Sequence, residues 1–400
     1  MSTTEARKKK SNTRLVFVII LFILGLPLWM WLAWLMSDRH RLVVAIIDKT
    51  VLNDKRQEHI SLNWVLNHER YMKNNSQLYE LKSDYFGFFP LKDEQYQVKG
   101  LERFDSSQIQ MLKDTADVAY ITDAYGIYRN EWYKVYDPKD RSPVVYGGMS
   151  DKDMDFLKGM QNAHKLIITE FNCIATPTSD SVRTRFDSAF GIKWSGWVGR
   201  YFDSFDTLDN KELPHWVYHN YMAQHNGAWP FKKSGICYVR IDDTIVILEN
   251  EVALDKETPY MLTNEQGQSY YGLPAKIKYP YWFEIDASDS SRNTTIAHFE
   301  TYPNAKGLDT LAKYGLPVSF PAITYHNQAD YKFFYFCADF CDNPIKLATS
   351  YFNGIAFFDW LFYNQKDPIQ RSGFFWLVYR PLVTRILNDY YAEIKKDGRK

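Results

Sequence analysis

The chain has 400 residues, of which 46% are hydrophobic and 24% charged, values close to those of folded proteins, which excludes a disordered or low-complexity chain. Its 48 Lys and Arg balance 48 Asp and Glu, so the whole chain lacks a basic field and we expect no nucleic-acid partner. Four cysteines are too few for a disulfide scaffold. Aromatic residues reach 17%, which predicts aromatic surfaces as well as a core.

A long apolar run lies near the N-terminus. Residues Leu15 to Met36 carry no charged side chain, and as a helix rising about 1.5 Å per residue they can cross a hydrocarbon core of about 30 Å. A cleaved signal peptide is the alternative, but its apolar region is shorter and precedes a small-x-small site. Here the run ends in Trp34-Leu35-Met36, so we expect one retained transmembrane helix over residues 15–36.

Basic residues flank this run unequally, because five precede it closely and two follow it closely. Positive charge stays on the cytoplasmic side of a membrane, so we expect a cytoplasmic tail over residues 1–14. The remaining body is then extracytoplasmic, on a single-pass protein of the cell membrane. Trp29, Trp31 and Trp34 fit an aromatic belt where the span leaves the bilayer.

Aliphatic runs alternate with amphipathic segments from residue 42 to residue 190. Unbroken apolar runs are typical of parallel strands that are covered on both faces. The alternation predicts an α/β domain with right-handed crossovers. The expected strands are 42–47, 118–122 and 165–169, and the expected helices are 58–71, 107–113, 150–162 and 180–189.

The pattern changes after Gly235. Residues 237–240 and 244–248 predict a hairpin, further strands are expected at 281–285, 295–300 and 332–336, and residues 345–395 are helical with an aromatic stripe that covers one face of the sheet. The predicted fold is α/β, a flavodoxin-like mostly parallel sheet with β-rich insertions and a C-terminal helical segment. We expect one domain over residues 38–345 and a helical extension over 346–400.

Carboxylates follow four of the expected strands, and ligands of open α/β sheets gather at the carboxyl ends of the strands. These residues are Asp48, Asp123, Glu170 and Asp339. Asp is also common in turns and caps, but Glu170 is not explained in that way. If the strands are neighbours, repulsion raises at least one pKa and places a general acid beside a general base. We predict Glu170 and Asp123 as the acid and base, supported by Asp48 and Asp339.

A bound hard cation is the alternative for such a cluster, but we assign no metal ligand, and the cofactor stays unknown. His215 and His219 have the i, i+4 spacing of a metal pair but lack the Glu of a metalloprotease motif, so a surface helix is the simpler interpretation.

Residues 192–206 combine tryptophans, tyrosine, arginine and glycines in what we interpret as an aromatic loop. Aromatic planes beside polar groups form platforms on which sugar rings stack, whereas a loop that plugs the sheet edge or docks on the outer leaflet is the alternative. The predicted substrate-binding residues are Tyr125, Tyr128, Asn172, Trp194, Trp197, Arg200 and Tyr201.

The order of elements over residues 40–345, with the stretch LIITEFNCIATPTSD after an inner strand, resembles the class I glutamine amidotransferase-like superfamily. The resemblance implies a flavodoxin-like sheet and a nucleophilic cysteine at the strand-to-helix turn, near Cys173. The glycines that flank that cysteine in the family are absent here. A buried structural role is the alternative for Cys173, and Cys337 and Cys341 have a spacing that permits a disulfide.

Two functions follow from these observations. The first is a membrane-anchored protein that binds, and hydrolyses or remodels, a cell-envelope glycan through strand-end carboxylates and the aromatic loop. The second is a non-catalytic, amidotransferase-like sensor or assembly subunit with a membrane-protein partner.

Overall fold

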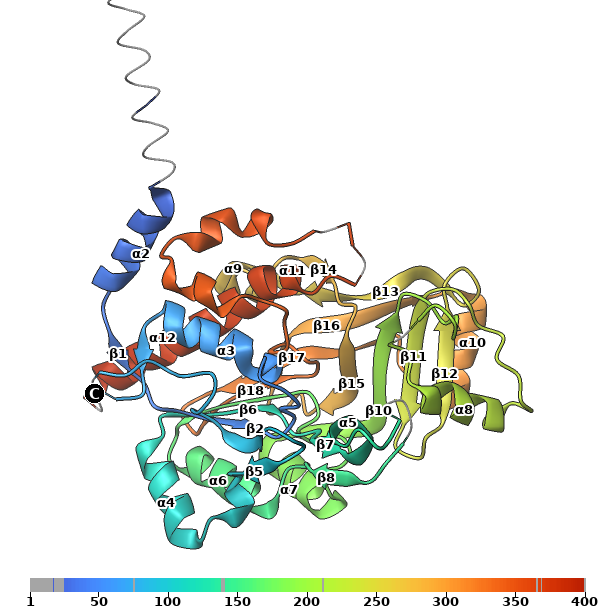
Figure 1. Ribbon diagram of the computed structural model, residues 1–400, viewed down its shortest axis with the longest axis horizontal. Coiled ribbons are helices and arrows are strands. Elements are labelled where there is room, and N and C mark those ends of the chain that lie inside the picture. Colours follow the sequence, from blue (N-terminus) through green and yellow to red (C-terminus); the bar gives the residue numbers. More distant parts are fainter. Residues whose placement is uncertain are drawn as a thin grey trace, which may run out of the picture.

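A mixed sheet of ten strands forms the middle of the computed structural model, which describes residue 17 and residues 25–74, 76–137, 141–210, 212–364, 366–367 and 369–398. Figure 1 shows this sheet with helices above and below it. Its strand order is β14-β13-β16-β17-β18-β9-β6-β2-β4-β5. The strands are β2 (Val44–Asp48), β4 (Phe86–Pro90), β5 (Tyr96–Val98), β6 (Val118–Asp123), β9 (Leu166–Glu170), β13 (Leu254–Thr263), β14 (Lys276–Lys278), β16 (Thr294–Pro303), β17 (Ser319–Asn327) and β18 (Lys332–Phe336).

Only the middle of this sheet is parallel. Neighbouring strands from β18 through β9, β6 and β2 to β4 run parallel, whereas every pairing outside this block is antiparallel. The α/β class is confirmed, but the prediction of a mostly parallel sheet is wrong. The connection from β17 to β18 spans only residues 328–331, and a parallel neighbour needs a crossover of about a dozen residues.

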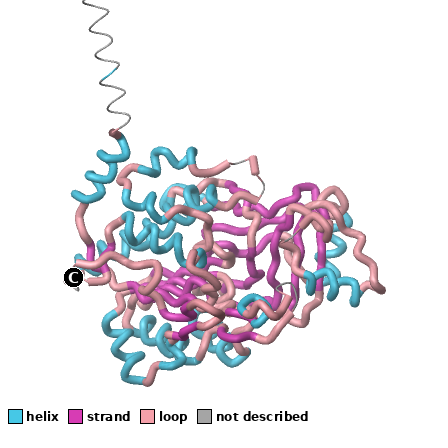
Figure 2. The backbone as a smooth tube through the Cα atoms, in the orientation of Figure 1, coloured by secondary structure: helices cyan, strands magenta, loops and turns pink. Residues whose placement is uncertain are grey.

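Helices cover both faces of the parallel block. On one face lie α3 (Gln57–His68) and a continuous helical stretch made of α11 (Ser372–Phe374), a π-helical turn η4 (Phe375–Tyr379) and α12 (Arg380–Lys396). On the other lie α4 (Ser106–Thr115), α6 (Asp151–Asn162) and α7 (Asp180–Phe190). Figure 2 shows these two helical layers with the strands between them. The predicted C-terminal helix over one face is confirmed.

Side chains of β2 alternate between the two faces, as a strand requires. Asp48 faces α3, where its carboxylate contacts His59. The next residue, Lys49, faces α6, where its Nζ lies 2.6 Å from Asp153. Asp153 and Ser150 form a capping box at the start of α6, with Asp153 N donating to Ser150 Oγ over 3.2 Å.

A second sheet stands at the carboxyl edge of the parallel strands, with order β12-β11-β10-β15. The predicted hairpin is confirmed as β11 (Gly235–Arg240) and β12 (Ile245–Glu249). The aromatic segment, by contrast, is not a loop but the strand β10 (Ile192–Phe202). Its register shifts between Trp194 and Val198, around Gly196 at φ 90°. This bulge interrupts the alternation by which a strand is recognised.

Two contacts hold the second sheet against the first. The backbone of Glu284 in β15 (Trp282–Ser288) donates to Cys337 O over 2.9 Å, and Asp339 N donates to Trp282 O over 3.2 Å. The second sheet therefore stands beside the turn that follows β18. The other elements are α2 (Leu26–Met36), β1 (His40–Arg41), β3 (Tyr71–Met72), η1 (Leu101–Arg103), β7 (Ile127–Tyr128), α5 (Arg129–Trp132), β8 (Val144–Tyr146), α8 (His215–Gln224), α9 (Glu265–Tyr271), α10 (Ala305–Tyr314), η2 (Leu347–Tyr351) and η3 (Ile355–Leu361).

The predicted tail 1–14 and most of the predicted span before residue 25 lie outside the described residues. Within the described ranges, no helix combines the length and the apolar composition needed to cross a bilayer. The helix α2 covers the end of the apolar run. Trp34, expected in an aromatic belt, is instead buried, because its Nε1 donates to Asn67 O over 3.0 Å and its ring meets Tyr351 edge-on at 5.0 Å.

Candidate active site

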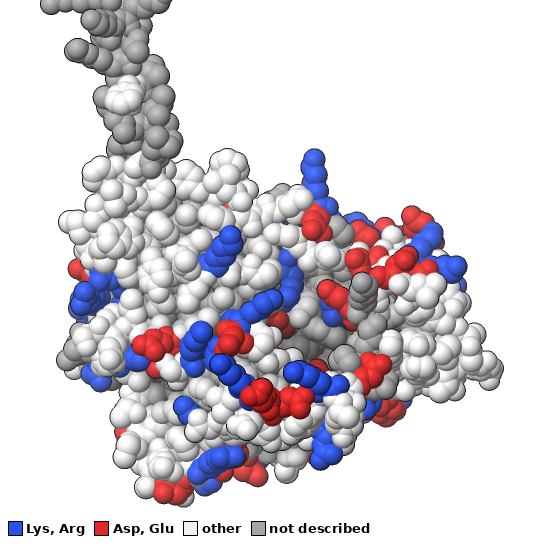
Figure 3. All heavy atoms as spheres, viewed as in Figure 1, with Lys and Arg blue, Asp and Glu red and all other residues white. Residues whose placement is uncertain are grey.

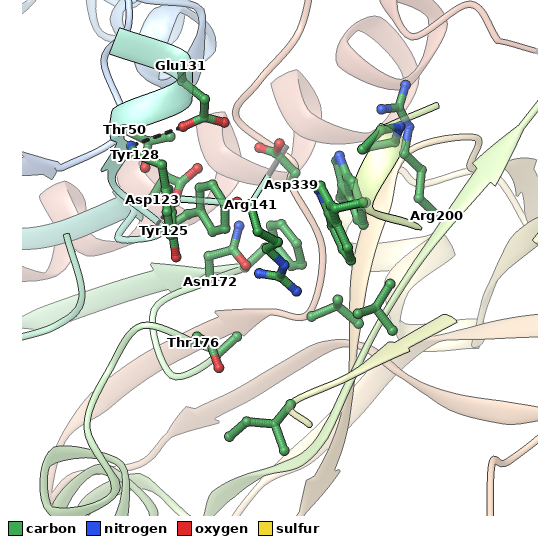
Figure 4. A pocket seen from close by; sticks show the side chains of 18 of the residues that line it. Thr50, Asp123, Tyr125, Tyr128, Glu131, Arg141, Asn172, Thr176, Arg200 and Asp339 are labelled. Carbon is green, nitrogen blue, oxygen red and sulfur yellow. Dashed lines mark hydrogen bonds between the residues drawn. The ribbon is translucent and has the colours of Figure 1, made fainter. Parts of the chain in front are cut away.

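A pocket of about 390 Å³ opens where the parallel strands end, between that edge and the second sheet. Figure 4 shows Asp123, Asn172 and Asp339 on the strand-end side of the pocket and Arg200 on the side of β10, with Arg141 between them. The topology explains this placement, because β18, β9, β6 and β2 are parallel neighbours whose ends share one edge.

Six acidic residues line the pocket, and four of them are Glu58, Asp123, Asp339 and Asp342. Asp123 and Asp339 are two of the predicted carboxylates. Glu58 in the first turn of α3 and Asp342 after β18 were not predicted. Among the described residues, no group of three or more His, Cys, Asp or Glu side chains has an arrangement that could hold a metal ion.

Burial raises the pKa of the carboxyl groups of Glu58, Asp123 and Asp339. It raises the pKa of Asp123 well above the usual range, and the charge of Asp48 adds to the effect. The pKa of Asp339 is raised by burial and by Asp342, and that of Glu58 by burial and by Asp48. Burial therefore favours the protonated form of Glu58, Asp123 and Asp339, which together form the floor of the pocket.

Asp342 differs from these groups because it faces a cation. Arg371 Nη1 lies 3.4 Å from its Oδ2, and Gln57 Nε2 donates to its Oδ1 over 2.5 Å. A carboxylate paired with a cation thus lies beside carboxyl groups whose protonated form is favoured by burial. General acid–base catalysis requires this combination of a proton donor and a proton acceptor.

Asp48 lies behind the floor and does not line the pocket. Its Oδ2 is 2.5 Å from His59 Nδ1, while His59 Nε2 is 2.9 Å from Leu81 O. A carbonyl oxygen can only accept, so Nε2 carries a hydrogen and Nδ1 shares one proton with Asp48. Thr50, which lines the pocket, donates from its backbone N to Asp48 Oδ1 over 3.0 Å.

Glu170 is not brought into the pocket. With the other even-numbered residues of β9 it faces the C-terminal helix, where it contacts the hydroxyl of Tyr120. Its Oε2 accepts from the backbone N of Phe340 at 3.1 Å and of Cys341 at 2.8 Å. Burial raises the pKa of Glu170 to about 8. Glu170 is therefore a buried structural residue that stabilises the turn that carries Asp339.

The predicted binding residues divide between pocket and core. Tyr125, Tyr128, Asn172, Trp194 and Arg200 line the pocket, with the two tyrosine rings 4.8 Å apart.

Trp197 and Tyr201 point the other way from β10, as alternation after the bulge requires. Trp197 packs in the core near Tyr314, and the Tyr201 hydroxyl donates to Glu257 over 3.2 Å. Trp216 and Trp282 line the pocket and were not predicted.

The cysteines do not reach the pocket. Cys173 is fully buried, its Sγ lies 3.8 Å from Ile121 O, and burial raises the pKa of its thiol well above the usual range. Asn172, at φ 64°, lines the pocket from the turn after β9. Cys337 and Cys341 are free thiols, so the permitted disulfide is not formed.

No family model matches the chain, and no curated protein matches it. Its structure is distantly similar to a protein described as ThuA-like from Bacteroides uniformis ATCC 8492, with a TM-score of 0.34 and 9% identity over 86% of this chain and 94% of that one. A β-galactosidase from Bacillus circulans sp. alkalophilus has a TM-score of 0.31 and 9% identity, with 77% of this chain and 30% of that one covered. The carbohydrate deacetylase Agd3 has a TM-score of 0.32 and 10% identity, with 86% of this chain and 33% of that one covered.

Proposed function

We propose that the pocket binds a carbohydrate chain and that its carboxyl groups catalyse hydrolysis of a bond in that chain. The observation that carries the proposal is the floor of the pocket, where Glu58, Asp123 and Asp339 are carboxyl groups with raised pKa values, beneath walls with three tryptophans. The sugar rings would pack their C–H faces against the aromatic walls, while the hydroxyl groups find polar partners. A volume of about 390 Å³ lies within the range of about 300–1,000 Å³ that is typical of ligand sites.

The proposed reaction uses a proton donor and a proton acceptor. Asp123 is the donor, because Tyr125 N donates to its Oδ1 over 2.6 Å and so orients the carboxyl group. Its proton passes to the leaving oxygen as the bond to that oxygen breaks. A water oxygen bonds to the reacting carbon and loses its proton to Asp342. The bond is glycosidic or belongs to an acyl substituent, and the product distinguishes the two.

The location is part of the proposal. The uncharged run over residues 15–36 and the basic residues before it support a single-span anchor with a cytoplasmic N-terminus. The pocket then lies outside the cytoplasm, and its substrate is a glycan of the cell envelope.

The binding part is tested by removing an aromatic wall. The Trp282→Ala variant of the full chain, in detergent micelles, is expected to bind envelope oligosaccharides about 10- to 100-fold more weakly, because a stacking face contributes about 1–3 kcal/mol. Saturation-transfer NMR and titration measure the affinity. Trp360→Ala, which removes an exposed tryptophan of η3, is the matched control. Equal affinities for wild type and Trp282→Ala would contradict the proposed binding mode.

A second candidate function is glycan binding without catalysis, by a sensor or assembly subunit with a membrane partner. The buried thiol of Cys173 and Asn172 at the strand exit favour it over thiol chemistry of the amidotransferase kind. Binding without any product, neither new reducing ends nor a released acyl acid, would decide for this candidate.

A further inference from the structure

Exposed apolar side chains gather on two elements that are far apart in the sequence. In α2 these are Leu28, Trp29, Trp31, Leu35 and Met36, and in η3 they are Phe357, Trp360 and Leu361. Met36 is 84% exposed and Phe357 is 88% exposed. Figure 1 shows the two elements side by side at the top of the molecule, and in Figure 3 this part of the surface is almost free of charged side chains. We call these eight residues the apolar platform.

The platform is fixed to the folded body. Asn353 N donates to Met30 O over 3.1 Å, which ties the approach to η3 to the middle of α2. Trp34 anchors the other side of α2 against Tyr351. Arg70 Nη1 donates to Leu35 O over 2.8 Å and so binds the C-terminal end of α2 to the body. The helices α2 and η3 therefore form one continuous surface that is fixed to the folded body.

We infer that the apolar platform is immersed in the bilayer leaflet next to the folded body, so that η3 is a second lipid contact beside the N-terminal anchor. A monomeric soluble body rarely exposes such a patch without a partner. Tryptophan, phenylalanine, leucine and methionine on one face are the composition of segments that lie in the membrane interface.

Continuity with the N-terminal run identifies lipid as the partner. The helix α2 is the second half of the uncharged run that begins at Leu15. A bilayer that contains the first half of this run must meet α2. It then meets η3 as well, because Asn353 is hydrogen-bonded to α2 at Met30. This step rests on the membrane anchor proposed above. Its consequence is that the folded body contacts the bilayer directly and keeps a fixed orientation to it.

Site-specific labelling tests the inference. All four native cysteines are buried and free, so a cysteine-reactive, environment-sensitive fluorophore labels an introduced cysteine selectively. The full chain carrying Phe357→Cys is reconstituted into phosphatidylcholine–phosphatidylglycerol vesicles, with Leu208→Cys as the matched control. Leu208 is 89% exposed, and it precedes α8, which Figure 1 shows at the other end of the molecule from α2. The expected result is a blue shift and strong quenching by nitroxide-labelled lipids at position 357, with neither at position 208.

The outcomes separate the anchor from the platform. A chain that does not float with the vesicles contradicts the anchor. A chain that floats, but whose label at position 357 emits as in water and is quenched by iodide as readily as at 208, overturns the platform alone. A blue shift that appears in detergent and grows with protein concentration would assign the patch to a second copy of the chain and also overturn the inference.

Discussion

Replacing Asp123 with Asn is expected to lower the turnover of the bound glycan by about 10²–10⁴-fold, with binding nearly unchanged. The amide keeps an oxygen that can accept from Tyr125 N, which is 2.6 Å from Asp123 Oδ1, and it matches the neutral form that burial favours. It cannot release a proton to a leaving oxygen. Product formation, followed as new reducing ends or as released acyl acid, measures the loss.

The matched control is Asp309→Asn, which removes an exposed carboxylate from α10. Its turnover should equal that of the wild type. A wild-type rate in Asp123→Asn would remove Asp123 from the mechanism, and Asp339→Asn and Glu58→Gln would then show whether another carboxyl of the floor is the donor. Wild-type rates in all three variants would contradict acid catalysis by the floor.

Replacing Glu170 with Gln is expected to stabilise the protein at alkaline pH by on the order of 5 kcal/mol. The pKa of Glu170 is raised from 4.5 to about 8 by burial, so the folded chain binds the proton more tightly than the unfolded chain. This contribution to stability is complete below about pH 4.5 and is lost as the pH rises through about 8. Gln stays neutral, and its carbonyl can accept from Phe340 N and Cys341 N as Oε2 does.

Thermal unfolding in detergent at pH 5 and pH 9 measures this effect. From pH 5 to pH 9, the melting temperature of the wild type should fall more than that of Glu170→Gln. At pH 5 the two proteins should have similar melting temperatures. Glu265→Gln, an exposed residue at the start of α9, should follow the wild type. Equal falls for wild type and Glu170→Gln would show that Glu170 is not held protonated. Since Glu170 lies outside the pocket, glycan turnover should persist in this variant at neutral pH.

Local sequence patterns were sufficient to predict the parallel strands β2, β6, β9 and β18 and the carboxylates at their ends, but they did not predict the parallel strand β4. The runs that became β2, β6 and β9 are apolar on both faces, so each strand and its following carboxylate could be recognised without knowing its neighbours. Asp123 and Asp339 then meet in one pocket because their strands lie close in the same parallel block.

The direction of individual side chains could not be predicted in the same way. Glu170 is the last residue of β9, and Asp123 is the last residue of β6. Glu170 nevertheless faces the C-terminal helix, whereas Asp123 follows a register shift in β6 and lines the pocket. The bulge at Gly196 interrupts the alternation in β10, so the sequence pattern did not indicate a strand there. The opposite directions of the Trp194 and Trp197 side chains therefore could not be predicted. Trp282 comes from a second sheet whose position depends on contacts distant in sequence.

The most direct measurement is a structure of the full-length Asp123→Asn variant with a bound envelope oligosaccharide. The predicted result is a sugar ring packed against Trp282 or Trp216, with the oxygen of the bond to be broken within hydrogen-bonding distance of residue 123. A sugar bound elsewhere on the molecule, or a pocket that stays empty at saturating oligosaccharide, would contradict the proposed site.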